Sequence, residues 1–356
     1  MADSRTIAKI LEEYERDKIT IATVCSHTSL QIFHGARMEG FKTLGIAIKK
    51  RPRFYDAFPL AKPDDFYVVE HYSEILDAAD EFIERNVIVV PHGSFVEYLG
   101  PENFIKLSFP TFGNRRVLEW ESDREKERIW LESAGLEMPK KIEDPKKIDR
   151  PVLVKYDGAK GGRGFFIAKD YAEFKLGIDY TKKYHIQEYI TGTRYYMHYF
   201  YSPITPRGYR VLDGSLELLS MDRRDEANID EMYKLGSQEE LKKHGIFPTF
   251  VVTGNVPVVL RESLLPKAFE MGEAVVKKSF ELFGGIIGPF CLESIVTDNL
   301  EFKVFEISAR IVAGTNLFTS GSPYSEFIEK GMSTGRRIAR EIKWAAERGL
   351  LHKIIT

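Results

Sequence analysis

The N-terminal part of the chain alternates short apolar runs with helical patterns, and this alternation limits the fold more than any other feature. Apolar runs rich in β-forming residues stand at 19–25, 43–48, 66–69 and 87–90. Helical patterns begin between them, at Thr28 and Ser73. This order predicts βαβ units and a parallel sheet. Because the first run is apolar almost throughout, we expect a strand covered on both faces, in a doubly wound α/β domain.

A charged helical stretch separates this domain from the rest of the chain. It covers 114–134, carries the charged run from Glu119 to Arg128 and ends at Gly135, a residue type common at helix C-termini. A Lys- and Asp-rich linker then leads to Arg150. We interpret the charged run as a solvated helix face.

Two further parts follow the linker. Strands at 151–156, 164–168 and 185–190, with a helix from Asp170, predict a small lid. The remainder is mixed α+β, with β-rich segments after Thr193, a helix over 263–283, two strands around Asp298 and a helical tail from Tyr324. A chain of 356 residues is longer than one hydrophobic core usually serves. We therefore expect three parts, at 1–122, 123–191 and 192–356.

Charge balance and apolar run length exclude several classes of partner. The 51 basic and 53 acidic residues give a formal net charge of −2, so nothing global indicates a nucleic acid or an anionic membrane. The longest apolar runs, such as 87–91, are too short to span a bilayer. We expect a cytoplasmic protein with small-molecule partners, and the oligomeric state stays open, a homo-oligomer included. Cys25 and Cys291 lie in apolar runs, which favours buried reduced thiols over a disulfide, a metal site or a catalytic thiol.

A glycine-rich loop stands between two predicted strands, in the segment KYDGAKGGRG at 155–164. Four glycines and three cations, among them Lys155 at the end of the first strand, allow backbone N–H groups to wrap a phosphate closely. The loop matches neither a Walker loop nor G-x-G-x-x-G. We predict a phosphate-binding glycine flap, with an ordinary hairpin as the alternative.

The two strands around Asp298 carry the strongest constellation. If the hairpin tip is 299–300, Asp298 pairs with Glu301, and counting outward places Glu293 directly opposite Glu306. Opposed Cβ atoms are about 4.5–5.5 Å apart, so the carboxylates repel unless one is protonated or a cation lies between them. The pair predicts a site for Mg²⁺ or Mn²⁺ beside nucleotide phosphates. A solvent-facing row of polar residues is the alternative.

Period two places Ser308 and Arg310 on the same strand face as Glu306, so a cation and an arginine converge there. In the first domain, His27 and the segment PHGS at 91–94 each follow a strand, at the carboxyl edge where open α/β sheets bind anions. Together these loops favour one phosphorylated ligand, although His27 could instead be a structural residue within its loop. No G-x-G-x-x-G follows the first strand, which disfavours a dehydrogenase.

These motifs resemble the ATP-grasp superfamily: a lysine before a glycine flap, the strand ending HIQEYITG at 185–192, and Glu293 with Glu306-x-Ser308-x-Arg310. Within it, the chain looks like the archaeal formate-dependent FAICAR synthetases (PurP family), through ATVCSHTSLQIFHGA at 22–36, PHGSF at 91–95 and FEISARIVAGTN at 305–316. The resemblance covers nearly the whole chain. It implies an ATP-grasp fold with a Rossmann-like, pre-ATP-grasp N-terminal domain, a small lid subdomain and a C-terminal α+β subdomain.

The resemblance also implies a reaction of purine (IMP) biosynthesis. ATP, formate and AICAR (5-aminoimidazole-4-carboxamide ribonucleotide) would give the formylated product FAICAR, ADP and phosphate. Formate would attack the γ-phosphate to give formyl phosphate, which the AICAR amine would then attack. The alternatives are an ATP-grasp ligase for another small carboxylate or amine, and a catalytically silent nucleotide-binding paralogue.

Site residues follow from the same resemblance. AICAR would contact His27, Ser94 and Asn255. ATP would contact Lys155, Gly161, Gly162, Glu188, Ile190 and Glu226. Mg²⁺ or Mn²⁺ would be held by Glu293 and Glu306, and the catalytic residues would be Arg310 and Lys155.

Two positions differ from the wider superfamily or are undecided. Ser308 stands where the superfamily often has asparagine, and a hydroxyl is a poorer metal ligand than an amide carbonyl. A second metal ion would therefore be held more weakly. Arg115 is the candidate for the superfamily's other phosphate-binding cation.

Overall fold

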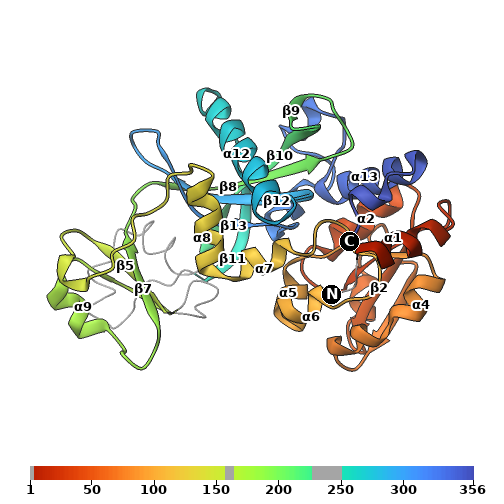
Figure 1. Cartoon of the computed structure of the whole chain (residues 1–356), viewed down its shortest axis with the longest axis horizontal. Helices are drawn as coiled ribbons and strands as arrows, with labels where there is room; N and C mark the ends of the chain where they lie inside the picture. The colour runs from red at the N-terminus through yellow and green to blue at the C-terminus, as the bar shows by residue number, and fades with distance from the viewer. Residues whose placement is uncertain (1–3, 157–163, 227–250) are drawn as a thin grey trace.

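The computed structural model describes residues 4–156, 164–226 and 251–356. In these ranges the N-terminal sheet lies at one end of the long axis, a three-stranded sheet lies at the other, and the largest sheet lies between them (Figure 1). The mixed α/β architecture is the one predicted from the sequence. None of the helices in the described ranges has the length and apolar character that a membrane span requires.

The N-terminal sheet is parallel, with the strand order β3-β2-β1-β4. Its strands are β1 (Thr20–Val24), β2 (Lys42–Ile48), β3 (Asp65–Val69) and β4 (Val87–Val89). Along β1, Val24 packs into one hydrophobic cluster and Ile21 into another, because alternate side chains point to opposite faces. The predicted strand covered on both faces is confirmed.

Short helices connect and cover these strands. They are α1 (Ser4–Glu13), α2 (Ser29–Met38), α3 (Pro52–Tyr55), α4 (Ala79–Glu84), α5 (Gly93–Leu99) and α6 (Pro101–Ile105). The helix predicted from Ser73 is instead a 3₁₀ segment, η1 (Tyr72–Asp77), followed by α4. Both elements are anchored in the main core cluster, η1 through Ile75 and α4 through Phe82.

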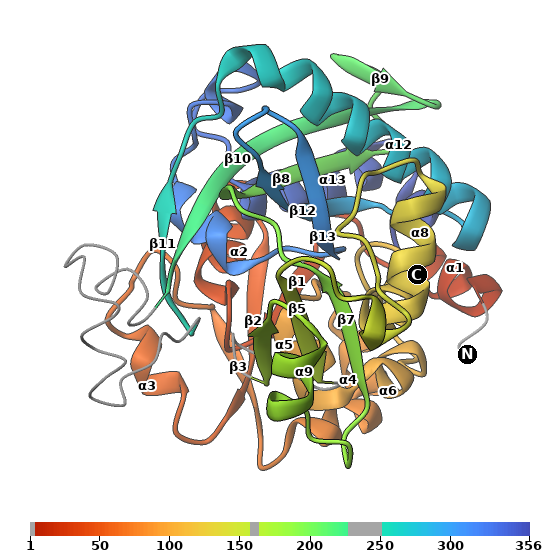
Figure 2. The ribbon, with the colours of Figure 1, turned by 90° about the vertical axis from the view of Figure 1, so that its left-hand side faces the viewer.

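We use the name lid for a small antiparallel sheet and its helix. The sheet has β5 (Val152–Tyr156) between β6 (Phe165–Ala168) and β7 (Tyr184–Glu188), and α9 (Tyr171–Gly177) packs on it. Asp170 caps α9 by accepting the Glu173 N–H at 2.9 Å. Val152, Val154, Phe174 and Ile186 form a separate small core. In Figure 2 the lid faces the viewer.

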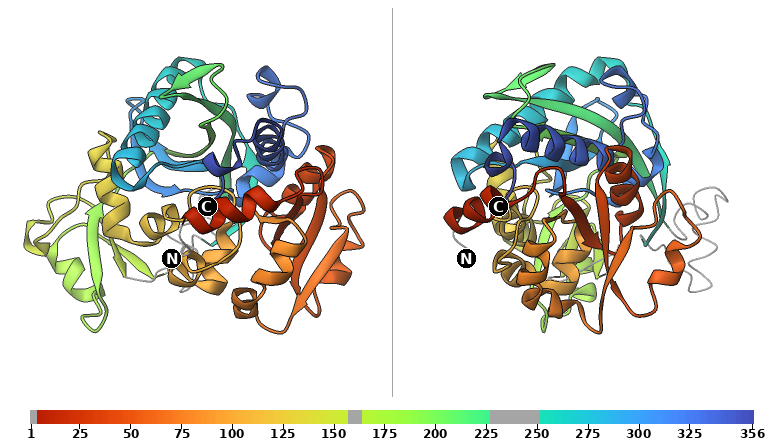
Figure 3. Two further views of the ribbon diagram at one scale, coloured as in Figure 1. Left: turned by 45° about the vertical axis from the view of Figure 1, so that its right-hand side comes forward. Right: turned by 90° about the vertical axis from the view of Figure 1, so that its right-hand side faces the viewer.

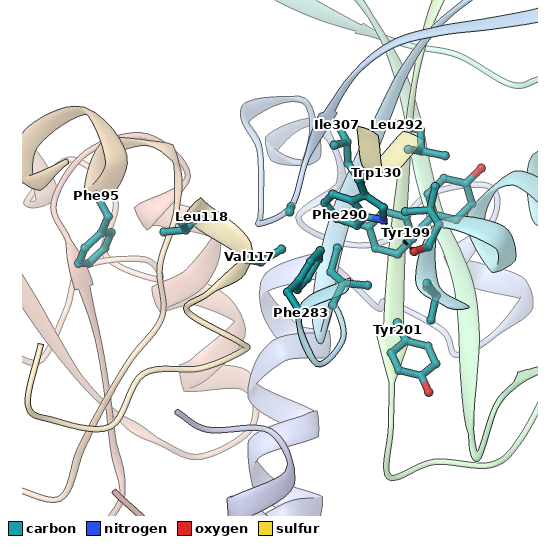
Figure 4. Packing of buried hydrophobic residues seen from close by; sticks show 14 of the residues in the cluster. Phe95, Val117, Leu118, Trp130, Tyr199, Tyr201, Phe283, Phe290, Leu292 and Ile307 are labelled. Carbon is teal, nitrogen blue, oxygen red and sulfur yellow. Dashed lines mark hydrogen bonds between the residues drawn. The ribbon is translucent and has the colours of Figure 1, made fainter. Parts of the chain in front are cut away.

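The largest sheet is antiparallel, with the order β11-β10-β8-β12-β13 and β9 paired to β10. Its strands are β8 (Thr193–Ser202), β9 (Tyr209–Val211), β10 (Gly214–Glu226), β11 (Val252–Pro257), β12 (Gly288–Val296) and β13 (Phe302–Ser308). η3 (Glu262–Leu264) leads into α12 (Leu265–Phe283), which covers one face. Trp130 locks α12 in place: its indole N–H donates to Val275 O at 3.1 Å, and its ring meets Phe283 edge-on at 4.9 Å (Figure 4).

The predicted helix over 114–134 is two helices, α7 (Val117–Ser122) and α8 (Arg124–Ser133). The break is at Asp123, whose carboxylate accepts the N–H groups of Glu125 and Lys126 and so starts α8. Gly135 ends the stretch as predicted, with φ +78°. A 3₁₀ turn, η2 (Pro145–Lys147), lies in the linker before the lid.

The hairpin between β12 and β13 differs from the prediction at its tip. The Thr297 N–H donates to Glu301 O at 3.0 Å, so the loop is 298–300 and the predicted pairing of Asp298 with Glu301 is wrong. A bulge beyond Glu293 then shifts the register by one residue. The two deviations cancel, and Glu293 lies opposite Glu306 as predicted.

The chain end returns to the N-terminal domain. After the 3₁₀ segments η4 (Ala313–Phe318) and η5 (Ser325–Phe327), the helix predicted from Tyr324 begins only at Thr334, as α13 (Thr334–Arg348), and η6 (Leu351–Lys353) follows. α13 lies tightly against α2, since a Cβ on Gly35 would be 2.2 Å from Arg336 N. Figure 3 shows the C-terminus beside α1.

Candidate active site

Glu293 and Glu306 face each other across β12 and β13, and each has an arginine partner. Glu293 is buried and accepts hydrogen bonds from Arg224 Nη2 at 3.1 Å and Ser308 Oγ at 3.2 Å. Burial raises the pKa of Glu293, Arg224 opposes the rise, and Glu306 adds to it. Glu306 is more accessible, and its Oε2 lies 3.2 Å from Arg124 Nη1. The predicted pair of carboxylates is thus present, with a positive charge beside each.

Arg124, at the start of α8, joins Glu306 to a third carboxylate. Its Nη1 also lies 3.2 Å from Glu127 Oε2, and Glu127 Oε1 accepts the Ile307 N–H at 2.8 Å. Burial raises the pKa of Glu127 to about 8, with the negative charge of Glu306 adding to the rise and Arg124 opposing it. Arg124 is therefore a cation held between two carboxylates, at the edge of β13.

A fourth carboxylate positions Arg310. Glu121 Oε1 lies 2.7 Å from Arg310 Nη2, and Glu121 Oε2 accepts the Ala309 N–H at 2.9 Å. Burial raises the pKa of Glu121, and Arg310 opposes the rise. Arg310 lies against the N-terminal domain as well, since a Cβ on Gly93 would be 3.4 Å from Arg310 Cζ.

The interpretation of the charged run as a solvated helix face is therefore wrong for Glu121 and Glu127, which are enclosed, whereas half of the Arg124 side chain is exposed. Glu121, Arg124 and Glu127 recur at every third position, but a solvated helix face can show the same spacing, so the sequence offered no signal that distinguishes them. Glu121 and Glu127 are enclosed because β13 is an edge strand. The N–H of Ile307 in this strand and that of Ala309 just after it need acceptors outside the sheet. The two glutamates supply them.

Lys155 faces the same charges from the lid. It lies in a cleft of about 600 Å³ that is also lined by Arg124, Glu127, Phe305 and residues 185–187 of β7. Burial lowers the pKa of Lys155, and Glu306 opposes the fall. The structure thus places Lys155 and Arg124 around one cleft between the lid and the largest sheet, with Glu306 beside Arg124.

Glu188 and Ile190, predicted from the resemblance to contact the nucleotide, lie at and just after the end of β7, next to the residues of β7 that line this cleft. Glu188 accepts the Lys140 N–H at 3.2 Å and lies 3.8 Å from Arg150. Ile190 follows the end of β7. Neither is among the described residues that line the cleft. Gly161 and Gly162, with most of the predicted flap, lie outside the described residues.

Arg115 is not placed to bind phosphate, which corrects that expectation. Its guanidinium donates to the backbone oxygens of Leu107, Phe109 and Thr356 and to Thr111 Oγ1. Burial lowers the pKa of Arg115 to about 10. Arg115 therefore ties the chain end to the N-terminal domain, whereas Arg124 is one of the cations that line the cleft.

The loops after β1 and β4 bring His27 and Ser94 together beside Arg310. The rings of His27 and His92 stack with centroids 6.4 Å apart, and an isolated bridge pairs His92 with Ile311, next to Arg310. Burial lowers the pKa of His27, and the positive charges of Arg310 and Arg224 add to the fall. The two predicted anion-binding loops thus lie at the end of β13.

His92 has a structural role at this junction that the sequence analysis did not assign. Its Nε2–H donates to Val24 O at 2.9 Å, and its Nδ1 accepts the Ser94 N–H at 3.3 Å, which caps α5. Burial lowers the pKa of His92 to about 3. Because Nδ1 must carry a lone pair to accept, the ring is neutral, and it fixes the backbone of Ser94.

Asn255 and Glu226 lie on the neighbouring strands β11 and β10. Asn255 Nδ2 donates to Asp222 Oδ2 at 2.7 Å. Glu226 forms an ion pair with Arg194 of β8. Both belong to the sheet that carries Glu293, so the largest sheet joins the residues predicted for AICAR, ATP and metal.

The two opposed glutamates fit a hard divalent cation that takes its other ligands from phosphate and water. Within the described ranges, no group of three or more His, Cys, Asp and Glu could hold a metal ion. Glu293 and Glu306 offer two carboxylates directly opposite each other, the register that a shared ion needs. Nearby Arg124 and Arg224 supply the countercharge in this structure. The donor set therefore suits an ion that arrives with nucleotide.

Comparisons with known proteins agree with this geometry. Two family models match, "Protein of unknown function (DUF1246)" over residues 21–142 and "Domain of unknown function (DUF1297)" over residues 175–356. The crystal structure of an N5-carboxyaminoimidazole ribonucleotide synthetase with ADP has a TM-score of 0.64 at 13% identity, over 92% of this chain and 77% of that one. At that identity the likeness shows the fold alone.

Two relatives are much more similar. A crystal structure of an IMP biosynthesis protein PurP from Thermococcus kodakaraensis has a TM-score of 0.74 at 35% identity, and covers 94% of this chain and 100% of that one. A 5-formaminoimidazole-4-carboxamide-1-(beta)-D-ribofuranosyl 5'-monophosphate synthetase from Methanococcoides burtonii is 63% identical over 356 residues, which are 100% of both chains. The chain therefore belongs to the 5-formaminoimidazole-4-carboxamide ribonucleotide synthetases, the PurP family.

Proposed function

We propose that this protein catalyses the ATP- and formate-dependent formylation of AICAR to FAICAR, with release of ADP and phosphate, in purine biosynthesis. The observation that carries the proposal is the opposed pair Glu293 and Glu306, with Arg310 and Lys155 nearby. The chain matches, over its full length, relatives that are named as FAICAR synthetases. The fold, which resembles other ATP-grasp enzymes, agrees with a carbon–nitrogen ligase.

Activation of formate is the first step. A formate oxygen attacks the γ-phosphorus of ATP, the bond to ADP breaks, and formyl phosphate forms. Negative charge on the transferring phosphoryl group is stabilised by Lys155, Arg310 and Arg124, whose positions are fixed before the reaction. These residues work by positioning and electrostatics, because a phosphoryl transfer needs little covalent help.

The second step joins the formyl group to the substrate amine. The AICAR nitrogen attacks the formyl carbon, a proton leaves the nitrogen, and phosphate is expelled with the oxygen that came from formate. His27, Ser94 and Asn255 hold AICAR for this attack. The place of the His27 and Ser94 loops beside Arg310 supports the assignment of these two residues, since the amine must reach the carbon activated there.

Glu293 and Glu306 would hold Mg²⁺, or Mn²⁺, together with the nucleotide phosphates. When bound, such an ion would neutralise phosphate charge and orient the transferring group. Ser308 donates to Glu293 in this structure, so we propose that it orients this ligand rather than binding a second ion.

The remaining ATP contacts are proposed from the resemblance and from the position of the cleft. Lys155 and Arg124 would contact phosphates, Gly161 and Gly162 would cover them, and Glu188, Ile190 and Glu226 would contact the nucleoside. A cytoplasmic location and the expected lack of nucleic-acid and membrane partners stay predictions from the sequence.

Labelled formate tests the proposed chemistry. With both formate oxygens labelled, mass spectrometry should find FAICAR as product and one labelled oxygen in the released phosphate. Unlabelled phosphate beside FAICAR would contradict formyl phosphate. If no FAICAR forms from formate but another acid in a small panel gives a different adduct, the protein is a ligase for another carboxylate. If ATP binds and no ADP is released with any acid, the protein is a silent paralogue.

A further inference from the structure

A buried carboxylate in the largest sheet holds the amide of Asn255 and an unexplained histidine at once. Asp222 of β10 accepts Asn255 Nδ2 at 2.7 Å through Oδ2 and His198 Nε2 at 2.5 Å through Oδ1. The side chains of Asp222 and His198 are 1% and 2% exposed. Neither Asp222 nor His198 has a role in the chemistry described above.

The direction of these hydrogen bonds follows from the chemistry of the groups. An ionised carboxylate can only accept, so both neighbours must donate to Asp222. One N–H of the Asn255 NH₂ group is therefore committed to Asp222, which fixes the planar amide with its Oδ1 turned away from the carboxylate. No described residue hydrogen-bonds to Oδ1. Because the amide is held by this N–H, Oδ1 has a fixed direction, and it is the acceptor that Asn255 can offer a ligand.

His198 secures this arrangement from the other side. Its Nε2–H donates to Asp222, and its Nδ1 is buried without a hydrogen-bond partner in the described part of the chain. A lone pair on Nδ1 costs less there than a second N–H without an acceptor. The ring is therefore a fixed donor to Asp222.

The backbone around Asp222 leaves it no room to turn. A Cβ on Gly314 would lie 2.1 Å from Asp222 Oδ1, so only glycine fits at that position of η4. η4 is itself held to α2, because Gln31 Nε2 donates to Thr315 O and Gln31 Oε1 accepts the Gly335 N–H at 2.9 Å. Asp222 is thus enclosed by η4, which is in turn held to α2 of the N-terminal domain.

We propose that Asp222, backed by His198, is a positioning residue that fixes Asn255 with its oxygen toward the ribonucleotide, so that the site selects an N–H donor there. The inference rests on the proposed function, because it takes Asn255 as an AICAR contact. Two groups of AICAR carry such a donor, the 5-amine and the carboxamide NH₂. If a ligand has only hydrogen-bond acceptors at that point, Asn255 Oδ1 faces another acceptor and stays without a donor. A polar site discriminates strongly against such a ligand.

A reciprocal exchange of Asp222 and Asn255 tests the inference. In Asp222→Asn, the new amide oxygen accepts from His198, and its NH₂ meets the NH₂ of Asn255, which must flip and present a donor to the ligand. In Asn255→Asp, two carboxylates meet. Each single variant should weaken AICAR binding by roughly ten- to a hundredfold, as expected when a polar contact is mismatched. The double variant restores a donor–acceptor pair and an acceptor toward the ligand, so most of the affinity should return.

AICAR binding by calorimetry, without turnover, is the measurement, with ATP affinity and melting temperature recorded beside it. Arg223→Gln is the matched control, since its side chain is exposed on the same strand. Equal AICAR affinity in wild type and both single variants would overturn the inference, as would a double variant no better than the weaker single one. Wild-type protein that binds no AICAR would instead overturn the proposed function.

Wild-type protein gives a second test if a variant fails to fold. The affinities of two AICAR analogues are compared with that of AICAR. One analogue has a carboxylate in place of the carboxamide, and the other has hydrogen in place of the 5-amine. Loss of at least about tenfold in affinity for one analogue identifies which N–H meets Asn255. Unchanged affinity for both analogues would overturn the inference.

Discussion

Glu121 holds Arg310 by two contacts: Glu121 Oε1 lies 2.7 Å from Arg310 Nη2, and Glu121 Oε2 accepts the backbone N–H of Ala309 at 2.9 Å. One carboxylate thus fixes both the guanidinium and the backbone beside it. Ile311, the next residue after Arg310, pairs with His92 of the N-terminal domain. Arg310 is therefore held at the junction between the β12–β13 hairpin, the proposed metal site, and the loops after β1 and β4, which we propose bind AICAR.

Replacing Glu121 by Gln should lower turnover roughly tenfold, which corresponds to about 1.4 kcal/mol, with a small effect on KM. The amide oxygen can still accept from Ala309, but Arg310 loses the charge that aims it. Steady-state kinetics measure the effect. Glu119→Gln, on the same helix and paired with Lys126 near the surface, is the control and should keep wild-type turnover. Equal turnover in both variants would show that Arg310 needs no such support.

Replacing Arg124 should change ATP binding, whereas replacing Arg115 should change stability. Arg124→Gln should raise KM for ATP roughly tenfold, because a cation of the phosphate cleft is lost. Arg115→Leu should leave KM for ATP near the wild-type value and lower the melting temperature, because buried carbonyls lose their donor at about 1–3 kcal/mol each. Melting curves and ATP kinetics for the two variants decide. A raised KM in a stable Arg115 variant would return that residue to the nucleotide site.

His27→Ala should raise KM for AICAR and leave KM for ATP nearly unchanged, because His27 lies with the N-terminal loops, whereas the proposed ATP site is the cleft between the lid and the largest sheet. A fall in melting temperature with drift in both constants would indicate a role in loop structure. A fall in turnover with loss of one limb of its pH profile would indicate proton transfer. An unchanged KM for AICAR would count against binding at His27.

His92 should make the protein less stable in mild acid. Its folded pKa of about 3 lies below the ordinary 6.5, so between these values the unfolded chain takes up a proton that the folded protein does not. Stability is therefore lost as pH falls through this window, by about 2 kcal/mol from pH 6.5 to about pH 5. In His92→Asn, which keeps an acceptor for the Ser94 N–H, this slope should flatten. His352→Asn, at an exposed position, should leave the slope unchanged, and an equal slope in all three proteins would refute the assignment.

The sequence was enough to predict the parallel N-terminal sheet, the lid and the pairing of Glu293 with Glu306. Local periodicity carries that information, since strands covered on both faces must be apolar throughout. The hairpin tip was beyond it. A loop of three residues and a bulge beside Glu293 each shift the register by one residue. The two shifts cancel, so the predicted pairing of Glu293 with Glu306 is right although the predicted tip is wrong.

Contacts between distant segments could not be read from local pattern. The charged run at 119–128 is indistinguishable from a solvated face until β13 is known to be an edge strand with N–H groups to satisfy. Arg115 carries the same charge as Arg124, yet one is spent on backbone carbonyls and the other faces the cleft. His198 and Asp222 lie 24 positions apart in unremarkable strands, and only the sheet register brings them together.

Phosphate release in the presence of ATP and Mg²⁺, with AICAR and formate each omitted in turn, tests the central assignment most directly. We predict release that requires both substrates, and that falls roughly a hundredfold in Glu306→Gln and in Glu293→Gln while the melting curves stay close to wild type. Release that continues without AICAR or without formate, or wild-type release by either variant, would contradict formylation at the Glu293–Glu306 site.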